Sequence, residues 1–243
     1  MVNTDPMPGD SFRFKRFTVR QDRCAMKVTT EGCLFGAWLA QQELEPKRIL
    51  DIGAGTGLLM LMAAQAYDCP IDGIEIDPSA ATQAGENLAE SPWSERLRVY
   101  EGDARVIQQD ARYSLIVSNP PFHKDSLRSL DAKINLARHD DSLDLQGLFE
   151  ACERHLSADG TIAVWLPCDR AEEWASICAG KGWKLKSRLH VRKKKIGDPF
   201  RTLTHVCREA CPSTIEGEVH IRELDGTYSE RFREWLRPYY LFL

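Results

Sequence analysis

The feature that most constrains the fold is a regular alternation of short apolar runs and helical stretches, which begins at Lys47. Compact apolar runs ended by glycine or proline are typical of buried parallel strands. Their alternation with helices indicates a doubly wound α/β domain whose ligands bind at the carboxyl ends of the strands. We expect strands at residues 48–52, 71–76, 97–100, 113–118, 161–166, 184–191 and 202–208, and helices at 58–67, 78–88, 143–156 and 170–181.

The expected sheet is Rossmann-like, with seven mostly parallel strands and an antiparallel hairpin at its end. A chain of 243 residues with 43% hydrophobic content can bury one core of this kind. We therefore expect a single domain over residues 1–243. Within it, residues 1–46 form a basic N-terminal segment next to the ligand site and residues 47–243 form the α/β core.

Composition excludes several classes of protein. No stretch approaches the roughly 20 apolar residues of a membrane helix, and residues 1–6 lack a signal pattern, so we expect a cytoplasmic protein. The eight cysteines lack the C-x2-C spacing of zinc sites, so we expect buried thiols and no metal. His205, Cys207 and Cys211 are close in sequence, but they lie on an expected strand and its exit.

A glycine-rich loop, Asp51-Ile52-Gly53-Ala54-Gly55-Thr56-Gly57, follows the first expected strand and opens a helix. Glycines at alternate positions let the backbone turn sharply and approach a ligand closely. A dinucleotide-binding loop would be spaced G-x-G-x-x-G. The spacing here is D-x-G-x-G-x-G, which resembles motif I of the S-adenosylmethionine methyltransferases.

Acidic residues stand at the ends of the next two expected strands. Glu75 ends the second strand, where a carboxylate can accept both ribose hydroxyls of a nucleoside, and Ile76 beside it can pack on the adenine ring. Asp103 and Ala104 follow the third strand, and Asp103 can accept a hydrogen bond from the adenine amine. Together with Asp51, these positions at successive strand ends indicate one cofactor site.

The fourth expected strand runs into Asn119-Pro120-Pro121-Phe122, a tetrad that could simply end the strand. An exocyclic amine on an aromatic ring is a poor nucleophile, because its lone pair is delocalised. The side-chain oxygen of Asn119 and the backbone carbonyl of Pro120 can accept hydrogen bonds from its two N–H groups. Phe122 offers a flat apolar face for an extruded base. The tetrad therefore predicts methylation of an amine, with no metal required.

Two basic stretches, residues 13–23 and 181–195, stand out in a chain whose net charge is −4. Binding of a polyanion by such a chain must depend on local patches, and both stretches flank the expected site. The side chains that we expect to contact RNA are Arg16, Arg23, Lys27, Lys193, Lys194 and Lys195.

These motifs together resemble those of the bacterial tRNA(Val) adenine-37 N6-methyltransferases. Further parts of the resemblance are Phe14-Lys15-Arg16-Phe17, Asp22-Arg23-Cys24-Ala25-Met26-Lys27-Val28, Thr30-Glu31-Gly32, Gly36-Ala37-Trp38, Asn87, Ser91-Pro92-Trp93, Leu136-Ala137-Arg138-His139 and the tail Tyr239-Tyr240-Leu241-Phe242-Leu243.

The resemblance implies a class I methyltransferase fold, S-adenosylmethionine as cofactor, tRNA as partner and transfer of methyl to adenine N6. It makes residues 1–46 a segment that covers the cofactor. The family has tyrosine where this chain has Phe122, so only the stacking role carries over. The implied catalytic residues are Asn119, Pro120 and Phe122, and the implied cofactor contacts are Asp51, Gly53, Gly55, Glu75, Ile76, Asp103, Ala104 and Asn119.

Three other functions remain open. Residues 118–123, S-N-P-P-F-H, also resemble the ribosomal RNA guanine-N2 methyltransferases. The same tetrad serves protein-glutamine methylation, which needs no basic patches. A catalytically silent RNA-binding protein could keep the fold, but the intact Asn119 and glycine-rich loop argue against it. We expect RNA adenine-N6 methylation, carried out by a monomer.

Overall fold

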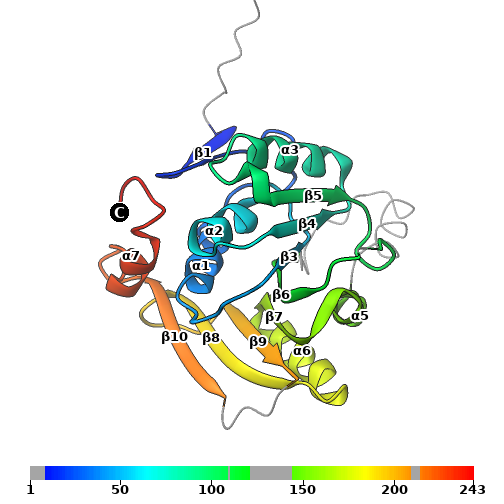
Figure 1. Cartoon of the computed structure of the whole chain (residues 1–243). Coiled ribbons are helices and arrows are strands. Elements are labelled where there is room, and N and C mark those ends of the chain that lie inside the picture. The colour runs from blue at the N-terminus through cyan, green and yellow to red at the C-terminus, as the bar shows by residue number, and fades with distance from the viewer. Residues whose placement is uncertain (1–8, 109, 121–143, 209–213) are drawn as a thin grey trace, which may run out of the picture.

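The structure is a computed structural model that describes residues 9–108, 110–120, 144–208 and 214–243. Its centre is an eight-stranded sheet with the strand order β10-β8-β9-β7-β6-β3-β4-β5 (Figure 1). In chain order the strands of this sheet are β3 (Ile49–Ile52), β4 (Ile71–Glu75), β5 (Leu97–Glu101), β6 (Tyr113–Ser118), β7 (Leu156–Pro167), β8 (Lys184–Lys194), β9 (Arg201–Cys207) and β10 (Ile215–Arg222).

Strand β9 is antiparallel to both of its neighbours, β7 and β8, and every other pair in this sheet is parallel. The carboxyl ends of seven strands therefore lie at one edge, which we call the carboxyl edge. The seven expected strands are all present, and β8 and β9 form the expected antiparallel pair. Strand β10 adds an eighth strand outside β8.

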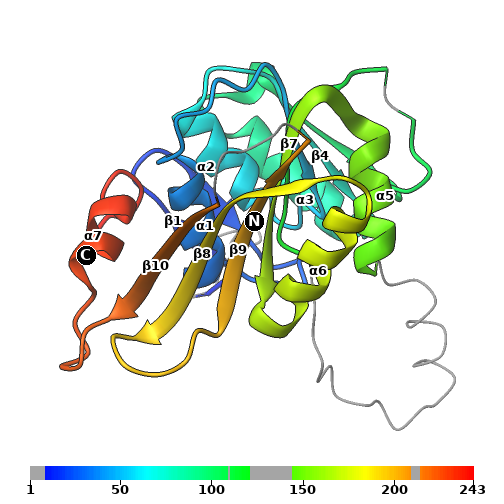
Figure 2. The ribbon, with the colours of Figure 1, turned by 90° about the horizontal axis from the view of Figure 1, so that it is seen from below.

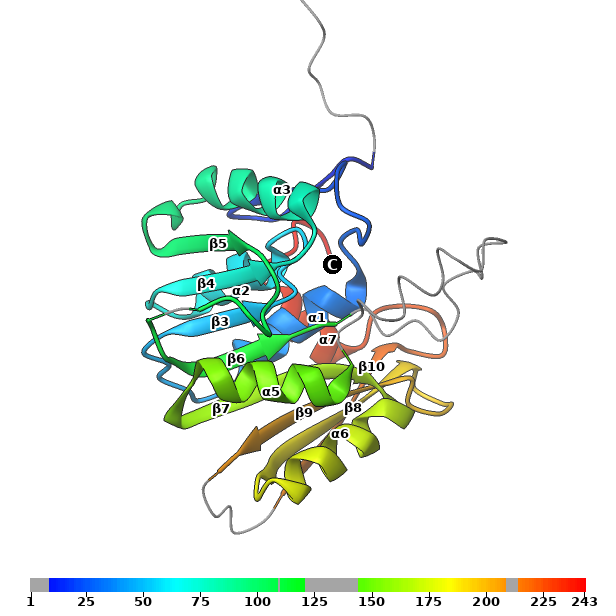
Figure 3. The same ribbon diagram turned by 90° about the vertical axis from the view of Figure 1, so that its right-hand side faces the viewer.

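Six α-helices in the described ranges cover the two faces of the sheet. Alternate side chains of each strand enter different cores: Ile49 packs on one face and Leu50 on the other. Figures 2 and 3 show α5 and α6 on one side, with α1, α2 and α7 across the sheet from them. The helices are α1 (Thr30–Leu39), α2 (Leu58–Ala66), α3 (Pro78–Ala89), α5 (Leu145–His155), α6 (Cys168–Gly180) and α7 (Glu230–Leu236), with a 3-10 turn at η1 (Ser94–Arg96).

Helices α2, α3, α5 and α6 stand where the sequence predicts them, whereas α1 and α7 were not expected. Helix α1 is buried along almost its whole length and contains Gly32 and Gly36. Such a sequence shows no amphipathic period, and glycine disfavours helices, so the helix depends on tertiary packing. Its start is fixed by Thr29, whose hydroxyl accepts a 3.0 Å hydrogen bond from Gly32 N–H.

Residues 9–28, which we call the N-terminal arm, form a hairpin of β1 (Ser11–Arg13) and β2 (Thr18–Arg20). The hairpin tip contacts the C-terminal tail, since Lys15 N–H donates a 2.8 Å hydrogen bond to the Tyr239 carbonyl. Beyond β2 the arm returns along α3 to the carboxyl edge. Of the helices in the described ranges, none combines the length and hydropathy that a membrane span requires.

Candidate active site

The glycine-rich loop, residues 51–57, connects β3 to α2 at the carboxyl edge. Gly53 and Gly55 have φ values of 79° and 54°, a left-handed conformation that favours glycine. A Cβ at either position would meet no atom within 4 Å, so the conformation rather than crowding requires glycine here. The backbone N–H groups of Gly53 and Ala54 donate to the Ile74 carbonyl at 2.9 and 3.2 Å, which fastens the loop to β4.

Glu75 is buried at the end of β4 and holds the loop through its carboxylate. Its Oε2 accepts a 2.7 Å hydrogen bond from Gly55 N–H, and its Oε1 accepts a 2.9 Å hydrogen bond from Asp77 N–H. Asp77 in turn caps α3 by accepting from Ala80 N–H at 2.8 Å. The predicted position of Glu75 at a strand end is therefore confirmed, and the residue also organises the loop.

Asp51 lies beside Glu75 and is 1% exposed. Its Oδ1 is buried and has no hydrogen-bond partner within the described part of the chain. Burial, together with the negative charge of Glu75, raises the pKa of Asp51 to about 8. A buried carboxyl with an unsatisfied oxygen at a ligand-binding edge is a candidate contact for a polar or cationic group.

Asp103 follows β5 and is held by a side chain that the sequence did not point to. Arg105 donates to both carboxylate oxygens of Asp103, with Nε and Nη2 at 2.6–3.0 Å from them. This pairing lowers the pKa of Asp103. Ala104, which lies between these two residues in the sequence, is buried. Its carbonyl lies 3.0 Å from Nε2 of His155 on α5. Burial lowers the pKa of His155, which favours a neutral ring that donates to this carbonyl.

Asn119 and Pro120 follow β6 at the same edge as the loop. The hydroxyl of Ser118 donates a 2.7 Å hydrogen bond to the Ile52 carbonyl, so the end of β6 is bonded to the start of the loop. The Asn119 amide faces the first turn of α1, because a Cβ placed on Gly32 would lie 3.9 Å from Asn119 Nδ2. Pro120 is buried, whereas Pro121 and Phe122 lie outside the described residues.

Known proteins are similar to this chain over nearly its whole length. Residues 34–165, more than half of the chain, match the family described as the methyltransferase small domain. The tRNA1(Val) (adenine(37)-N6)-methyltransferase of Dyadobacter fermentans is 42% identical over 95% of this chain and 97% of the relative. Proteins of the same name from Tolumonas auensis and Escherichia fergusonii are 40% and 37% identical, covering 97% and 99% of this chain and 98% and 99% of the relatives. This chain belongs to the tRNA1(Val) (adenine(37)-N6)-methyltransferase family.

Membership of this family makes the chain an S-adenosylmethionine-dependent methyltransferase, as the loop spacing predicted. Solved structures agree on the fold. A protein described as a predicted O-methyltransferase from Agrobacterium tumefaciens superposes with a TM-score of 0.64 at 15% identity, covering 85% of this chain and 95% of that one. The ribosomal protein L11 methylase of Lactobacillus delbrueckii gives a TM-score of 0.55 at 16% identity, covering 79% and 84%. At such identities the likeness shows the class I methyltransferase fold alone.

The first basic stretch of this methyltransferase divides between the two edges of the sheet. The guanidinium carbon of Arg16 lies 5.1 Å from the ring centroid of Trp93, which precedes β5 at the opposite edge. Arg23 pairs with Glu86 on α3, and Lys27 is exposed in the last part of the arm. Arg16 therefore lies away from the carboxyl edge, so only part of the first stretch flanks the expected site.

The second basic stretch reaches the carboxyl edge at the end of β8. Two strands, β9 and β7, separate β8 from β6, and the registers place Arg188 level with Ser118 at the end of β6. The end of β8 at Lys194 therefore lies about 14 Å across the sheet from β6 and about 20 Å further along the strand direction. Lys193 Nζ lies 5.1 Å from the ring centroid of Phe200, and Lys194 is exposed. Lys195 Nζ is 3.4 Å from Glu223 Oε2, so part of its charge is paired.

The cysteines offer no second site in the described ranges, where no group of three or more histidine, cysteine, aspartate or glutamate side chains could hold a metal ion. His205 is buried against Trp38, with ring centroids 6.1 Å apart, and burial lowers its pKa to about 4. Cys207 is buried, and Cys211 lies outside the described residues.

Two contributors to the site were missed by sequence reasoning. Gly32 brings the start of α1 against Asn119, and Arg105 holds Asp103. Thr29, three residues before Gly32, is an N-cap signal that could have revealed α1. A basic residue two positions after an aspartate is too common to predict the Arg105 contact.

Proposed function

We propose that this protein transfers a methyl group from S-adenosylmethionine to the N6 amine of adenine 37 in tRNA(Val). Relatives that match nearly its full length carry this activity in their names. The observation that carries the proposal is the position of Asn119, at a strand end bonded to the glycine-rich loop and beside the first turn of α1. An amine held by this amide would face the glycine-rich loop, at which we propose that the cofactor binds.

The residues around the loop fit the cofactor, which supplies a methyl group on a cationic sulfur. Asp51 has a buried oxygen that accepts no hydrogen bond from the described residues, which suits a cationic ligand. Glu75 uses one lone pair of each oxygen on Gly55 and Asp77, and the others remain for ribose hydroxyls. Ile76, 56% exposed beside Glu75, offers an apolar face to an adenine ring.

The remaining cofactor contacts follow the same edge. Gly53 and Gly55 leave the backbone of the loop open to a ligand, since no atom lies within 4 Å of a Cβ built on either. Asp103 and Ala104 follow β5 at this edge, and we propose that they contact the adenine of the cofactor. Arg105 fixes the orientation of the Asp103 carboxylate, whose remaining lone pairs can accept from that amine.

Asn119 and Pro120 would hold the target amine in the proposed reaction. The side-chain oxygen of Asn119 accepts one N–H of the amine and the Pro120 carbonyl accepts the other, so the nitrogen lone pair is held toward the methyl group. Such positioning and electrostatic stabilisation account for most of the rate enhancement in transfers of this kind. Phe122, which lies outside the described residues, is proposed from its sequence position to stack on the base.

Lysines near the carboxyl edge would bind the RNA backbone. Lys193, Lys194 and Lys195 at the end of β8, with Lys27 in the arm, are the side chains that we propose to contact phosphates. Phosphate contacts position the nucleic acid while the pocket at Asn119 reads the base. Arg23 is paired with Glu86, and Arg16 lies at the opposite edge, so we leave both out of this surface.

We further infer that residues 1–46 cover the cofactor while residues 47–243 form the methyltransferase core of one domain. The arm supports this inference, because the pKa of Cys24, raised mainly by burial to about 11, is also raised by the charges of Glu75 and Asp77. The hydrogen bond from Arg23 N–H to Gln83, on the helix that Asp77 caps, also brings this part of the arm toward the carboxyl edge. Helix α1 then continues the segment to Asn119.

A methyl-transfer assay with three acceptors tests the proposed function. Purified protein with labelled S-adenosylmethionine is offered bulk tRNA, ribosomal RNA or a glutamine-containing peptide. We expect label in tRNA alone. Transfer to ribosomal RNA or to the peptide would contradict the proposal in favour of the related amino-methyltransferases, and RNA binding without transfer would indicate a silent enzyme.

A further inference from the structure

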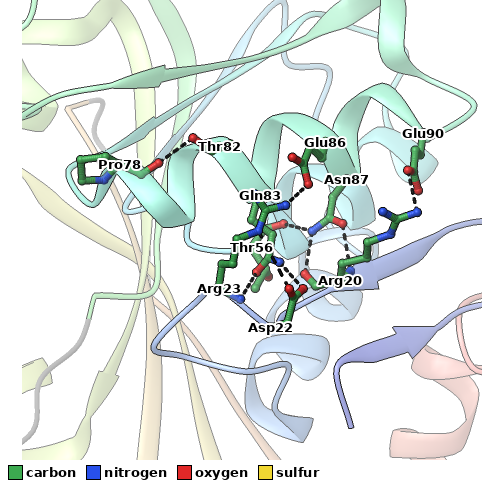
Figure 4. A network of polar contacts seen from close by, with 10 residues as sticks. All are labelled: Arg20, Asp22, Arg23, Thr56, Pro78, Thr82, Gln83, Glu86, Asn87 and Glu90. Atoms are coloured by element: carbon green, nitrogen blue, oxygen red, sulfur yellow. Dashed lines mark hydrogen bonds and ion pairs between the residues drawn. The ribbon is translucent and has the colours of Figure 1, made fainter. Parts of the chain in front are cut away.

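Asn87 of α3 is a buried polar residue that neither the cofactor nor the target base would contact. It is 1% exposed, yet three hydrogen bonds satisfy its side-chain amide (Figure 4). Its Oδ1 accepts from Arg20 N–H at 2.9 Å, and its Nδ2 donates to the carbonyls of Arg20 and Thr56, both at 2.9 Å. Both amide protons are thus used, one on each of two separate chain segments.

One of these segments is the glycine-rich loop. Thr56 precedes Gly57, the N-cap of α2, so its carbonyl lies outside the hydrogen-bond ladder of that helix. It stands between Gly55 and Gly57, both at positive φ, and Gly55 N–H is bonded to Glu75. A ligand that fixes this part of the loop therefore also fixes the carbonyl that Asn87 binds.

The other segment is the N-terminal arm. Asn87 binds both the N–H and the carbonyl of Arg20, as a neighbouring strand would. From Arg20 the arm runs back along α3 to Arg23, whose N–H donates to Gln83, one turn nearer than Asn87 to the start of the helix at Asp77. The Oε1 of the buried side chain of Gln21 then accepts a 2.7 Å hydrogen bond from Val28 N–H, which closes residues 21–28 into a loop next to the ligand site.

A second buried amide on the same face of α3 provides a natural comparison. Gln83 is 0% exposed, and its hydrogen bonds within the described residues go to the arm: its Oε1 accepts from Arg23 N–H at 3.1 Å and its Nε2 donates to Asp22 at 2.6 Å (Figure 4). Arg23 and Arg20 add ion pairs with Glu86 and Glu90 at the surface. Of these four α3 side chains, Asn87 is the one with a hydrogen bond to the glycine-rich loop among the described residues.

We propose that Asn87 is a positioning residue that couples ligand binding at the glycine-rich loop to the ordering of residues 20–28. The proposal rests on the cofactor site proposed above. A ligand that orders the loop strengthens the hydrogen bond from Asn87 to the Thr56 carbonyl. Because the same amide also binds the backbone of Arg20, its hydrogen bonds to Arg20 are strengthened as well. The arm then closes over the ligand site more firmly when the site is filled. Coupling of this kind is reciprocal, so a firmly held arm also favours the bound ligand.

Hydrogen–deuterium exchange of the full chain, with and without saturating S-adenosylhomocysteine, tests this coupling without turnover. Calorimetry on each variant establishes saturation. In the unmodified protein we expect the ligand to slow exchange in residues 20–28 by about fivefold or more, the lower end of ordinary allosteric coupling. Asn87→Ala should remove this slowing. Gln83→Ala should raise exchange in the arm without ligand but keep the slowing on binding.

The possible outcomes separate the coupling from the cofactor site. Slowing that persists in Asn87→Ala, or is absent from the unmodified protein with ligand bound, would overturn the coupling and leave the cofactor site intact. Failure of the unmodified protein to bind S-adenosylhomocysteine would overturn the cofactor site and the coupling with it. If Asn87→Ala does not fold, Asn87→Asp keeps the acceptor for Arg20 N–H but cannot donate to Thr56, and the same loss of slowing is expected.

Discussion

Among single residues, Asn119 has the largest part in the proposed reaction, because its oxygen bonds the amine as positive charge develops there. Asn119→Ala should lower kcat by about 10²–10³, as removal of comparable polarising groups does. Its effect on the affinity for S-adenosylhomocysteine should be much smaller. Single-turnover rates and calorimetry measure the two quantities. If Asn119→Ala kept near-normal turnover, the Asn119-Pro120 pair would serve only to end strand β6.

Asp51 should make cofactor binding depend on pH. With a pKa of about 8, its carboxyl holds a proton at neutral pH in the ligand-free protein. A cationic ligand favours the carboxylate, so affinity should rise by up to about tenfold per pH unit below pH 8 and then level off. Calorimetry from pH 6 to pH 9 measures this rise.

The matched control is Asp51→Asn, which should bind more weakly at high pH and lose most of the rise. A pH dependence that survives in Asp51→Asn would assign it to another group. The stability of the ligand-free protein should change with pH in the opposite direction to the affinity. The folded state keeps a proton on Asp51 that the unfolded state has lost, so the contribution of Asp51 to the free energy of unfolding falls as pH rises toward 8.

The positions of the site residues could be read from the sequence, but their partners could not. Asp51, Glu75 and Asn119 each stand at the end of an apolar run, and parallel strands bring such ends to one edge. That Glu75 would hold Gly55 N–H, or that Arg105 would hold Asp103, depends on loop geometry that no periodicity encodes.

Among the elements, α1 has a functional role through its first turn. A Cβ on Gly32 would lie 3.2 Å from Leu58 Cδ2, so Gly32→Ala should displace the Leu58 side chain by a few tenths of an ångström, whereas Asn119 Nδ2, at 3.9 Å, would be in ordinary contact. We expect kcat to fall by only about twofold to threefold, since misplacement of about 1 Å can cost about 100-fold and Asn119 is affected only indirectly here. Cofactor affinity should change little.

Gly85→Ala in α3 is the matched helix control. Its Cβ would meet only Val99 Cγ1, at an ordinary 3.6 Å. Alanine should stabilise the helix by about 0.5–1 kcal/mol and raise the melting temperature slightly, with kcat unchanged. Equal losses of kcat in both variants would show that the effect of Gly32→Ala is not specific to Asn119.

The elements that the sequence predicted are those with a strong period, and the missed ones depend on distant partners. Strand β10 is an edge strand with charged residues facing outward, and only Val219 and Ile221 enter the core. Helix α7 is a short helix near the C-terminus that buries Phe232 and Leu236. The sequence patterns of β10 and α7 resemble that of a surface loop, because their structure depends on packing against the sheet.

The whole molecule carries a net charge of −4, so RNA binding must depend on local groups of basic residues. Simultaneous replacement of Lys193, Lys194 and Lys195 by alanine should weaken tRNA binding. The log–log slope against salt should fall by about 0.7 for each single-strand phosphate that the variant no longer neutralises. Lys195 is paired with Glu223, so we expect the change in slope to be smaller than three free lysines would give.

The comparison for this salt titration is Arg16→Ala, at the opposite edge of the sheet. It should leave the slope unchanged, and neither variant should alter cofactor affinity. If the triple variant bound tRNA with the original affinity and slope, the lysines would be a solvated surface without a ligand.

Position-resolved mass spectrometry of a tRNA1(Val) transcript after incubation with the protein and S-adenosylmethionine tests the central claim most directly. We predict N6-methyladenosine at position 37, and no methylation of a transcript in which guanosine replaces adenine 37. A methyl group on another nucleotide, N2-methylguanosine in either transcript, or an unmodified adenine 37 would contradict the account.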